Sequence, residues 1–384
     1  MKSKRTRFIT LLILLALFTT IFPVDTFAQF ETSAGAAILI EASTGQVLYE
    51  KNSDVAMPPA SITKVMTLLL GFEAISKGEA KWDDLVNVSE NAWRMEGSRM
   101  FLELGSKVPY RDIIKGISIV SANDGCVALA EHLYGSQKAF VELMNQRAKE
   151  LGMTNSTFKN CTGLPEEGHV LSARDIATMS LYLIQNYPEI LEIESTREFT
   201  FNNIHQYNRN PLLGVYEGAD GLKTGWTEEA GYCLVATAMR NDIRLIAVIL
   251  NTKSDNERKT AAEELLNYGF KNFKLLEFKK AGEIVDTMEV TNGKKPSVQL
   301  KLDSDIKIMV PVARVDDIQT VITKDSQSIK APVNADISVG KLEVKLDGQI
   351  LASSGISTAE SIEKAGFFKR LLNGIIGFFK SLKK

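Results

Sequence analysis

The chain has 384 residues, of which 45% are hydrophobic and 24% charged, a composition typical of a globular protein with more than one domain. Its net charge of −2 is unevenly distributed: residues 1–28 carry +3, residues 363–384 carry +5, and the part between them carries −10. A mildly acidic body does not favour nucleic acid as a partner. Two basic ends favour contact with anionic membrane surfaces.

The N-terminal segment has the pattern of a secretory signal peptide. Basic residues precede an apolar stretch over residues 8–22, and small residues near Ala28 permit cleavage. We therefore expect residues 1–28 to be a signal peptide and the mature protein to be exported. An uncleaved membrane anchor is the alternative, but Pro23 and Asp25 interrupt the run before about 20 apolar residues are reached.

The next part of the chain predicts strands followed by helices. Residues 36–50 indicate two strands around a Ser43-Thr44-Gly45 turn, and apolar residues at spacings of three and four predict a helix over 61–77. Further on we expect the following elements: two helices within 110–135 separated by a turn at 121–125, a helix over 136–152, a loop over 153–172 and a helix over 172–187.

The pattern then returns to strands. The glycine-bounded segment 221–225 is expected at a strand edge, 231–251 forms an apolar hairpin turning at Asn241-Asp242, and 254–273 is helical. These elements predict an α/β (α+β) domain over residues 29–277, with helices flanking an antiparallel sheet. Alternating apolar and polar residues predict a small separate all-β domain over 280–356.

Residues 359–384 have the pattern of a basic amphipathic helix. One face would be apolar and the other rich in Lys and Arg, which favours a helix lying flat at the outer face of the cytoplasmic membrane. The alternative is a helix docked on the protein itself or on a partner helix.

The cysteines and histidines give little sign of chemistry. We expect Cys126, Cys161 and Cys233 to be small buried apolar residues, with one disulfide plus a free thiol as the alternative. The three histidines form no zinc-type cluster, and the chain lacks a GxSxG motif. No metal or cofactor is expected.

Three short motifs carry the chemical signal: SITK at 61–64, SAN at 121–123 and KTG at 223–225. Each is weak alone, since SxxK also occurs at Ser156–Lys159 and SxN at Ser89–Asn91. Their combination is more specific, because 61–64 begins a long apolar helix, 121–123 lies at a break between helices and 223–225 lies at a strand edge. The alternative for Ser61 is an N-cap.

Ser61 and Lys64, three residues apart on a helix, can touch. A serine hydroxyl is a poor nucleophile until a neighbour accepts its proton, and a lysine accepts one only when its pKa is lowered. Burial and a nearby positive charge would lower the Lys64 pKa, and Lys223 could supply that charge.

With these motifs in this order, the chain resembles serine penicillin-binding enzymes and β-lactamases. More narrowly, it is similar to low-molecular-mass penicillin-binding proteins of the D-alanyl-D-alanine carboxypeptidase type. The supporting stretches are "PPASITKVMT", "SANDGCVALAEHLYGS", "FNNIHQYNRNPLL" and "DGLKTGWTEEAGYCLVATA".

The resemblance implies roles for individual residues. Ser61 would be the nucleophile, Lys64 its base and Ser121 a proton relay towards the leaving amine. Asn123 would bind the substrate amide, and Lys223 with Thr224 the terminal carboxylate. Gly225 would admit the substrate backbone, and the N–H groups of Ser61 and Trp226 would form the oxyanion hole. Trp226 stands at a position that varies in the family, and its side chain would shape either the pocket entrance or deacylation. Arg209 is a further carboxylate candidate whose alternative role is a structural ion pair.

The implied reaction removes the terminal D-alanine from peptidoglycan stem pentapeptides through a Ser61 acyl-enzyme. β-Lactam antibiotics would acylate the same serine and block the enzyme. The alternatives are an endopeptidase or transpeptidase, a β-lactamase and a non-catalytic envelope module. Glu166 and Glu167 are present where a class A β-lactamase would carry its deacylating glutamate, but the surrounding pattern does not match.

Overall fold

The structure is a computed structural model that describes residues 30–366. The expected signal peptide and residues 367–384 of the expected C-terminal helix lie outside the described residues.

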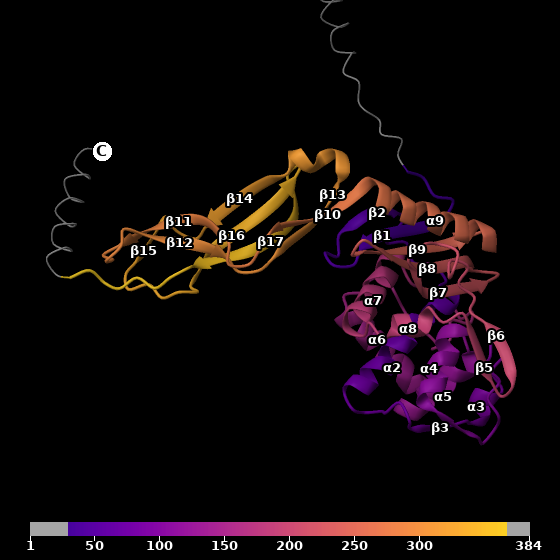
Figure 1. Ribbon diagram of the computed structural model, residues 1–384. Coiled ribbons are helices and arrows are strands. Elements are labelled where there is room, and N and C mark those ends of the chain that lie inside the picture. Colours follow the sequence, from indigo (N-terminus) through magenta and orange to yellow (C-terminus); the bar gives the residue numbers. More distant parts are fainter. Residues whose placement is uncertain (1–29, 367–384) are drawn as a thin grey trace, which may run out of the picture. The chain divides into compact units, whose positions relative to one another are not determined.

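A five-stranded antiparallel sheet forms the centre of the first domain (Figure 1). The strands lie in the order β2 (Val47–Lys51), β1 (Ala36–Glu41), β9 (Ile243–Thr252), β8 (Gly231–Arg240) and β7 (Ala219–Thr227). Helix α9 (Asp255–Asn272) covers one face, and the remaining helices lie on the other (Figure 1). Because both faces are covered, β1, β8 and β9 are almost continuously apolar and buried. Strand β7 is left at an edge.

The helices largely follow the apolar spacing of the sequence. They are the 3-10 turn η1 (Ala60–Thr63), α2 (Lys64–Ser76), α3 (Glu90–Trp93), α4 (Tyr110–Ile119), α5 (Asn123–Tyr134), α6 (Gln137–Glu150), α7 (Ala173–Asn186) and α8 (Ile190–Glu194). Serine side chains cap α6, α7 and α9 at Ser136, Ser172 and Ser254. The predicted break between α4 and α5 is present, and Ser121 lies in it with a φ of 62°.

Several short elements were not predicted. They are α3, α8, the pair β3 (Leu85–Asn87) and β4 (Lys107–Pro109), and the hairpin β5 (Glu198–Phe201) and β6 (Ile204–Tyr207). Each is too short to establish a period, so its conformation depends on contacts with the rest of the domain.

The second domain is all-β, as predicted. Its six-stranded sheet has the order β14 (Gln319–Lys324), β16 (Ser338–Leu346), β17 (Gln349–Thr358), β12 (Ser297–Leu302), β11 (Ile284–Thr291) and β15 (Ser328–Lys330). A second pair joins β10 (Phe273–Lys279) and β13 (Ile306–Pro311), and a 3-10 turn, η2, spans Val312–Asp317. Strand pairing therefore begins at Phe273 rather than at 280.

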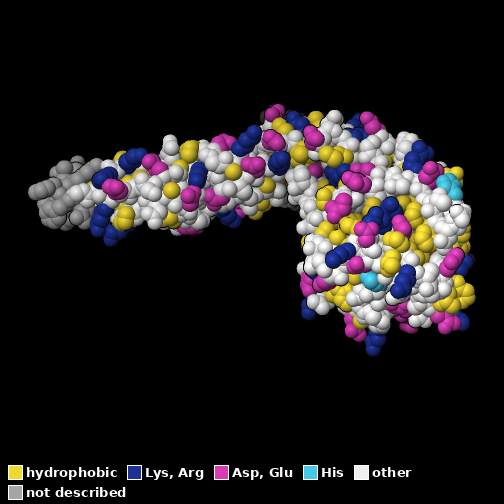
Figure 2. Space-filling view, turned by 60° about the horizontal axis from the view of Figure 1, so that its bottom comes forward, with side chains coloured by type: hydrophobic (Ala, Val, Ile, Leu, Met, Phe, Trp, Pro, Cys, Tyr) yellow, Lys and Arg dark blue, Asp and Glu magenta, His cyan; other side chains and the backbone are white. Residues whose placement is uncertain are grey.

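The β domain has its own apolar core, which includes Leu300, Ile308, Val344 and Ile356. On the face shown in Figure 2, basic and acidic side chains are interspersed over this domain. Many form exposed pairs, such as Lys301 with Asp336. Pairs of this kind contribute only about 0–1 kcal/mol each, so the core provides most of the stabilisation.

The expected helix over 359–384 is wrong for its first residues. Ile362 forms a bridge with Val333, and Lys364 forms one with Gly293, so this segment is extended along the β domain. Ile362 and Ala365 are buried there. The amphipathic pattern therefore applies at most to residues beyond 366.

The three cysteines are buried and free, as expected from the sequence. The alternative of one disulfide and one free thiol does not apply. Burial raises the pKa of Cys126 and Cys233 to about 11. Across residues 30–366, no helix is both long and apolar enough to traverse a bilayer. The same residues contain no cluster of three or more His, Cys, Asp or Glu arranged to hold a metal ion.

Candidate active site

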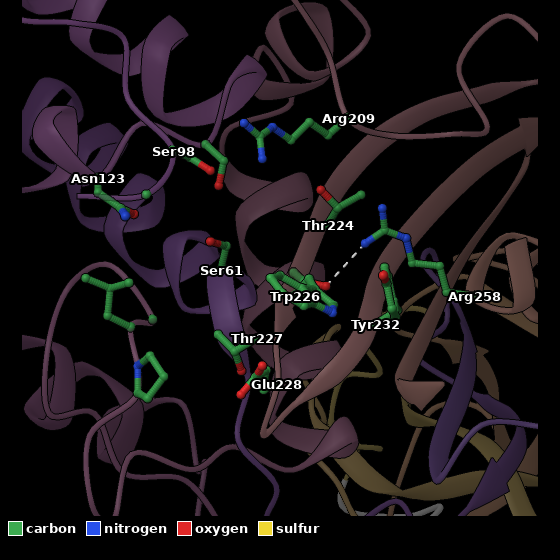
Figure 3. Close-up of a pocket in the computed structure, with 16 residues that line it drawn as sticks. Ser61, Ser98, Asn123, Arg209, Thr224, Trp226, Thr227, Glu228, Tyr232 and Arg258 are labelled. Carbon is green, nitrogen blue, oxygen red and sulfur yellow. Dashed lines mark hydrogen bonds between the residues drawn. The ribbon is translucent and has the colours of Figure 1, made fainter. Parts of the chain in front are cut away.

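A groove of about 800 Å³ brings the three sequence motifs together. Figure 3 shows Ser61 in its middle, Asn123 and Ser98 on one side, and Thr224 and Trp226 of β7 on the other. Edge strand β7 forms one wall. The loop before β4 and the break between α4 and α5 form the opposite wall.

Ser61 lies in η1 and its hydroxyl contacts the Lys64 amine. Lys64 Nζ is 2.8 Å from Ser61 Oγ and donates a hydrogen bond of 2.6 Å to the Thr162 carbonyl. No side chain caps η1 or α2, so the N-cap alternative for Ser61 is wrong. In a 3-10 turn, side chains at i and i+3 eclipse, which places the two groups side by side.

Lys64 is completely buried. Burial is the largest cause that lowers the pKa of its amine. The Cys126 and Cys161 thiols oppose this effect, and the positive charge of Arg209 adds to it. Within the described part of the chain, no carboxylate forms an ion pair with this amine. The sequence hypothesis named burial and the charge of Lys223; burial is the largest cause here, and the charge that lowers the pKa is that of Arg209.

Ser121 and Asn123 line the groove, and each carries a buried polar atom without a partner among the described residues. Both side chains are 3% exposed, and the Ser121 Oγ and Asn123 Oδ1 atoms have no hydrogen-bond partner within residues 30–366. The Asn123 amide nitrogen donates to the Glu96 carbonyl at 2.7 Å, and Asn123 lines the groove. Unpaired buried polar atoms are costly, so these two are the atoms of the groove for which a ligand would supply a missing partner.

Lys223 points inward from β7 and is also buried. Its amine is 3.3 Å from the Thr224 carbonyl. Burial lowers the Lys223 pKa, the Glu194 carboxyl opposes this effect, and the charges of Lys64 and Arg209 add to it. Glu194, at the end of α8, is buried, and burial raises its pKa. This buried carboxyl beside the KTG lysine was not foreseen from the sequence.

Gly225 allows β7 to approach the turn that carries Ser61. A Cβ at this position would lie 3.0 Å from the Pro59 carbonyl oxygen and 3.1 Å from the Ser61 nitrogen. The close approach expected for the substrate is therefore already used by the protein's own backbone. Trp226, the next residue, is 54% exposed and lines the groove entrance.

Two arginines lie at the Thr224 end of the groove (Figure 3). Arg258 on α9 donates to the Gly225 carbonyl at 3.2 Å and pairs with Asp255. Arg209 forms no ion pair with any described residue, so the structural alternative does not apply to it. Partial burial, followed by the charge of Arg258, lowers the Arg209 pKa.

The 159–169 loop is hydrogen-bonded to the 3-10 turn that carries Ser61. His169 Nδ1 accepts from the Lys159 amide at 3.1 Å, so Nε2 carries the proton and donates to Thr63 Oγ1 at 2.8 Å. Thr63 in turn donates to the Ala60 carbonyl at 2.9 Å. The same loop supplies the Thr162 carbonyl that holds Lys64.

The opposite wall is held by Asp124. Its carboxylate accepts from the amides of Met100 and Leu102, both at 3.0 Å, which fixes the loop that carries Ser98 into the groove. The β5–β6 hairpin supports this loop, since Gln206 donates to the Arg99 carbonyl at 3.1 Å.

All nine predicted site residues lie in this groove or directly beneath it. Ser61, Ser121, Asn123, Thr224, Gly225, Trp226 and Arg209 line it, and Lys64 and Lys223 are buried behind the lining. Sequence reasoning missed Arg258, Ser98, Glu194 and Glu228. Of these, only Arg258 could have been recognised from the sequence, because a charged residue on the buried, apolar face of the predicted helix over 254–273 is unusual.

Two family profiles cover most of the chain. Residues 24–254 match the peptidase family S11, described as D-alanyl-D-alanine carboxypeptidase, and residues 273–364 match the C-terminal domain of penicillin-binding protein 5.

Individual relatives agree with these matches. The D-alanyl-D-alanine carboxypeptidase DacF of Bacillus subtilis (strain 168) is 40% identical over 346 residues, which span 88% of each chain. The crystal structure of penicillin-binding protein 5 from Haemophilus influenzae has a TM-score of 0.80 at 34% identity, covering 87% of this chain and 99% of its own. Penicillin-binding protein D2 of Listeria monocytogenes, solved in an ampicillin-bound form, has a TM-score of 0.58 at 34% identity over 63% of this chain and 98% of its own.

Proposed function

The chain belongs to the D-alanyl-D-alanine carboxypeptidase family of serine peptidases, and we propose that Ser61 is the nucleophile with which it removes the terminal D-alanine from peptidoglycan stem pentapeptides. The observation that carries this proposal is the 2.8 Å contact between Ser61 Oγ and the buried Lys64 amine.

Lys64 is the general base in this proposal. Its lowered pKa favours the neutral amine, whose lone pair accepts the Ser61 proton as the hydroxyl attacks. The Thr162 carbonyl orients the amine by accepting one of its N–H groups. Burial keeps competing water away from the pair.

The developing oxyanion is held by the backbone N–H groups of Ser61 and Trp226. The close approach of Gly225 to the Ser61 nitrogen supports this role, because it brings the β7 backbone beside the Ser61 amide. Oriented amides of this kind typically stabilise a transition state by about 3–4 kcal/mol each.

The substrate binds along edge strand β7. Its terminal carboxylate meets Thr224 and Arg209, with the positive charge of Lys223 behind them. Asn123 Oδ1 accepts the N–H of a substrate amide, which supplies its missing partner. Ser121, also without a partner, relays the proton to the departing amine.

The reaction has two steps. Ser61 Oγ bonds to the carbonyl carbon between the two terminal D-alanines, and D-alanine leaves with the transferred proton. Water then attacks the acyl-enzyme, releases the shortened peptide and returns the proton to Ser61. A β-lactam would acylate the same oxygen and leave it blocked.

We further propose that the mature chain, from about Gln29, acts outside the cytoplasm on the outer face of the cytoplasmic membrane. The basic, apolar sequence of residues 367–384 supports attachment to an anionic membrane surface.

The test uses the mature chain and two substrates. Wild-type protein is expected to release D-alanine from diacetyl-L-Lys-D-Ala-D-Ala and to bind a fluorescent penicillin covalently, and Ser61→Ala is expected to do neither. Full labelling of Ser61→Ala would refute the nucleophile. Rapid release of hydrolysed penicillin would indicate a β-lactamase, and labelling without D-alanine release would favour an endopeptidase or transpeptidase.

A further inference from the structure

The groove carries opposite charges at its two ends. Arg209, Arg258 and the buried Lys223 lie at or behind the Thr224 end, and Glu228 lines the other end. Figure 3 shows Arg209 and Glu228 on opposite sides of Ser61.

Two more carboxylates lie near the end of the groove that Glu228 lines, which is called the acidic end below. Glu229 and Glu166 line a small adjoining cavity, which shares Gly163, Leu164, Pro165 and Thr227 with the groove. Both are exposed, as is Glu228. No lysine or arginine within residues 30–366 forms a salt bridge with any of the three.

The proposed function fixes the direction in which a peptide lies here. Its C-terminal carboxylate is at Thr224 and its scissile carbonyl is between Ser61 and Trp226. Extended residues advance about 3.4 Å each along a strand. The residue before the two D-alanines therefore lies beside Thr227 and Glu228, in a groove that Leu164 and Pro165 also line.

An independent observation supports a peptide that extends along the groove rather than occupying its basic end alone. Asn123 lines the same cavity as Glu228, and its Oδ1 is buried and has no hydrogen-bond partner within residues 30–366. An amide oxygen can only accept, so it fits a hydrogen-bond donor such as a backbone N–H of an extended peptide. Such a peptide continues from Asn123 towards the acidic end.

We propose that Glu228, assisted by Glu229 and Glu166, binds a primary ammonium group on the side chain of the third residue from the substrate's C-terminus. This inference rests on the proposed function and adds a substrate preference to it. The preferred substrate is a stem peptide whose diamino acid is free, and acylation of that amine, as in a cross-link, removes the attraction.

The experiment compares Nα-acetyl-L-Lys-D-Ala-D-Ala with its Nα,Nε-diacetyl form, in which the side-chain amine is acylated and carries no charge. We expect kcat/KM for D-alanine release to be roughly two- to five-fold higher for the free amine at low salt, the range of an exposed ion pair. The ratio should fall towards one at about 1 M salt, where the screening length is about 3 Å.

Variants test whether the preference for the free amine depends on Glu228. Glu228→Gln should bring the ratio of the two kcat/KM values towards one, and Glu228→Lys should reverse it. Glu142→Gln, an exposed glutamate of α6 outside the groove lining, should leave the wild-type ratio. Penicillin labelling of each variant reports that its fold and Ser61 are intact.

The outcomes separate the two proposals. Equal rates for the two peptides in the wild type, or an unchanged ratio in Glu228→Lys, would overturn this inference while D-alanine release still stands. Absence of D-alanine release from both peptides would overturn the proposed function itself.

Discussion

The contact between Ser61 and Lys64 results from the way their helix begins. The chain enters through a 3-10 turn, in which residues three apart eclipse, and only then becomes an α-helix. Lys64 is therefore directed into the domain beside the serine, where burial disfavours its charged form. The spacing of the two residues was readable in the sequence. The complete burial of Lys64 was not, because it depends on the 159–169 loop folding over it.

Replacing Lys64 with arginine tests the base directly. A guanidinium stays protonated and cannot accept the Ser61 proton, so we expect the penicillin acylation rate to fall about 10²–10⁴-fold. Lys77→Arg is the matched control, since Lys77 is exposed and pairs with Glu73. A Lys64→Arg rate within tenfold of wild type, in a protein with an unchanged melting temperature, would exclude Lys64 as the base.

Arg209 gives a second test at this scale. Loss of a hydrogen bond to a charged group costs about 1.5–3 kcal/mol, so Arg209→Gln should lower kcat/KM on a D-Ala-D-Ala peptide about 10–100-fold. A peptide ending in D-alaninamide should lose much less. Arg197→Gln, which lines a separate cavity, serves as the control. Equal losses in both variants would contradict carboxylate binding by Arg209.

Among the elements, the predictable ones are those whose pattern repeats. The β8–β9 hairpin, the broken pair α4–α5 and helix α9 all follow from apolar spacing with clear turn or capping residues. Short elements such as α8 and β5–β6 do not, although they position parts of the site. Glu194 lies at the end of α8, and β5–β6 supports the Ser98 loop. Long-range contacts fix these elements, and such contacts leave no local pattern.

The His169 contact gives the 159–169 loop a dependence on pH. Burial lowers the His169 pKa to about 4, against a smaller opposing effect of Glu166, with Lys159 adding to the lowering. The unfolded chain binds a proton below about pH 6.5, whereas the folded chain does not until about pH 4. This histidine therefore favours folding above pH 6.5, and that contribution is lost as the pH falls through 4.

Urea unfolding of wild type and His169→Gln at several pH values measures the pH-dependent contribution of His169 to the free energy of unfolding. The free energy of unfolding of the wild type should fall by up to about 3 kcal/mol more than that of the variant between pH 6.5 and pH 4. The variant should be less stable at pH 7, because it loses the hydrogen bond to Thr63. Identical pH dependences would show that His169 protonation is not linked to folding.

At the scale of the whole molecule, two separate apolar cores account for the two domains. The change from helical to alternating patterns predicted a division near residue 277, and in the structure α9 ends at Asn272 and β10 begins at Phe273. The end of the β domain was misplaced, because residues 359–366 resemble the amphipathic sequence that follows them. Ile362 instead packs into the β-domain core.

Two truncations separate the β domain from the proposed anchor. Mature chain ending at Gly366 should keep its stability and penicillin labelling but lose binding to vesicles rich in anionic lipid. Chain ending at Thr358 should also lose about 2–4 kcal/mol of β-domain stability, because buried Ile362 and Ala365 are removed. Vesicle binding that persists after truncation at Gly366 would refute the anchor.

The most direct test of the central claim is to locate the covalent adduct. Mature protein incubated with penicillin, digested and mapped by mass spectrometry should carry the acyl group on the peptide that contains Ser61, at one group per chain. An adduct on Ser121 or on any other residue, or none on Ser61 while D-alanine is still released, would contradict the account.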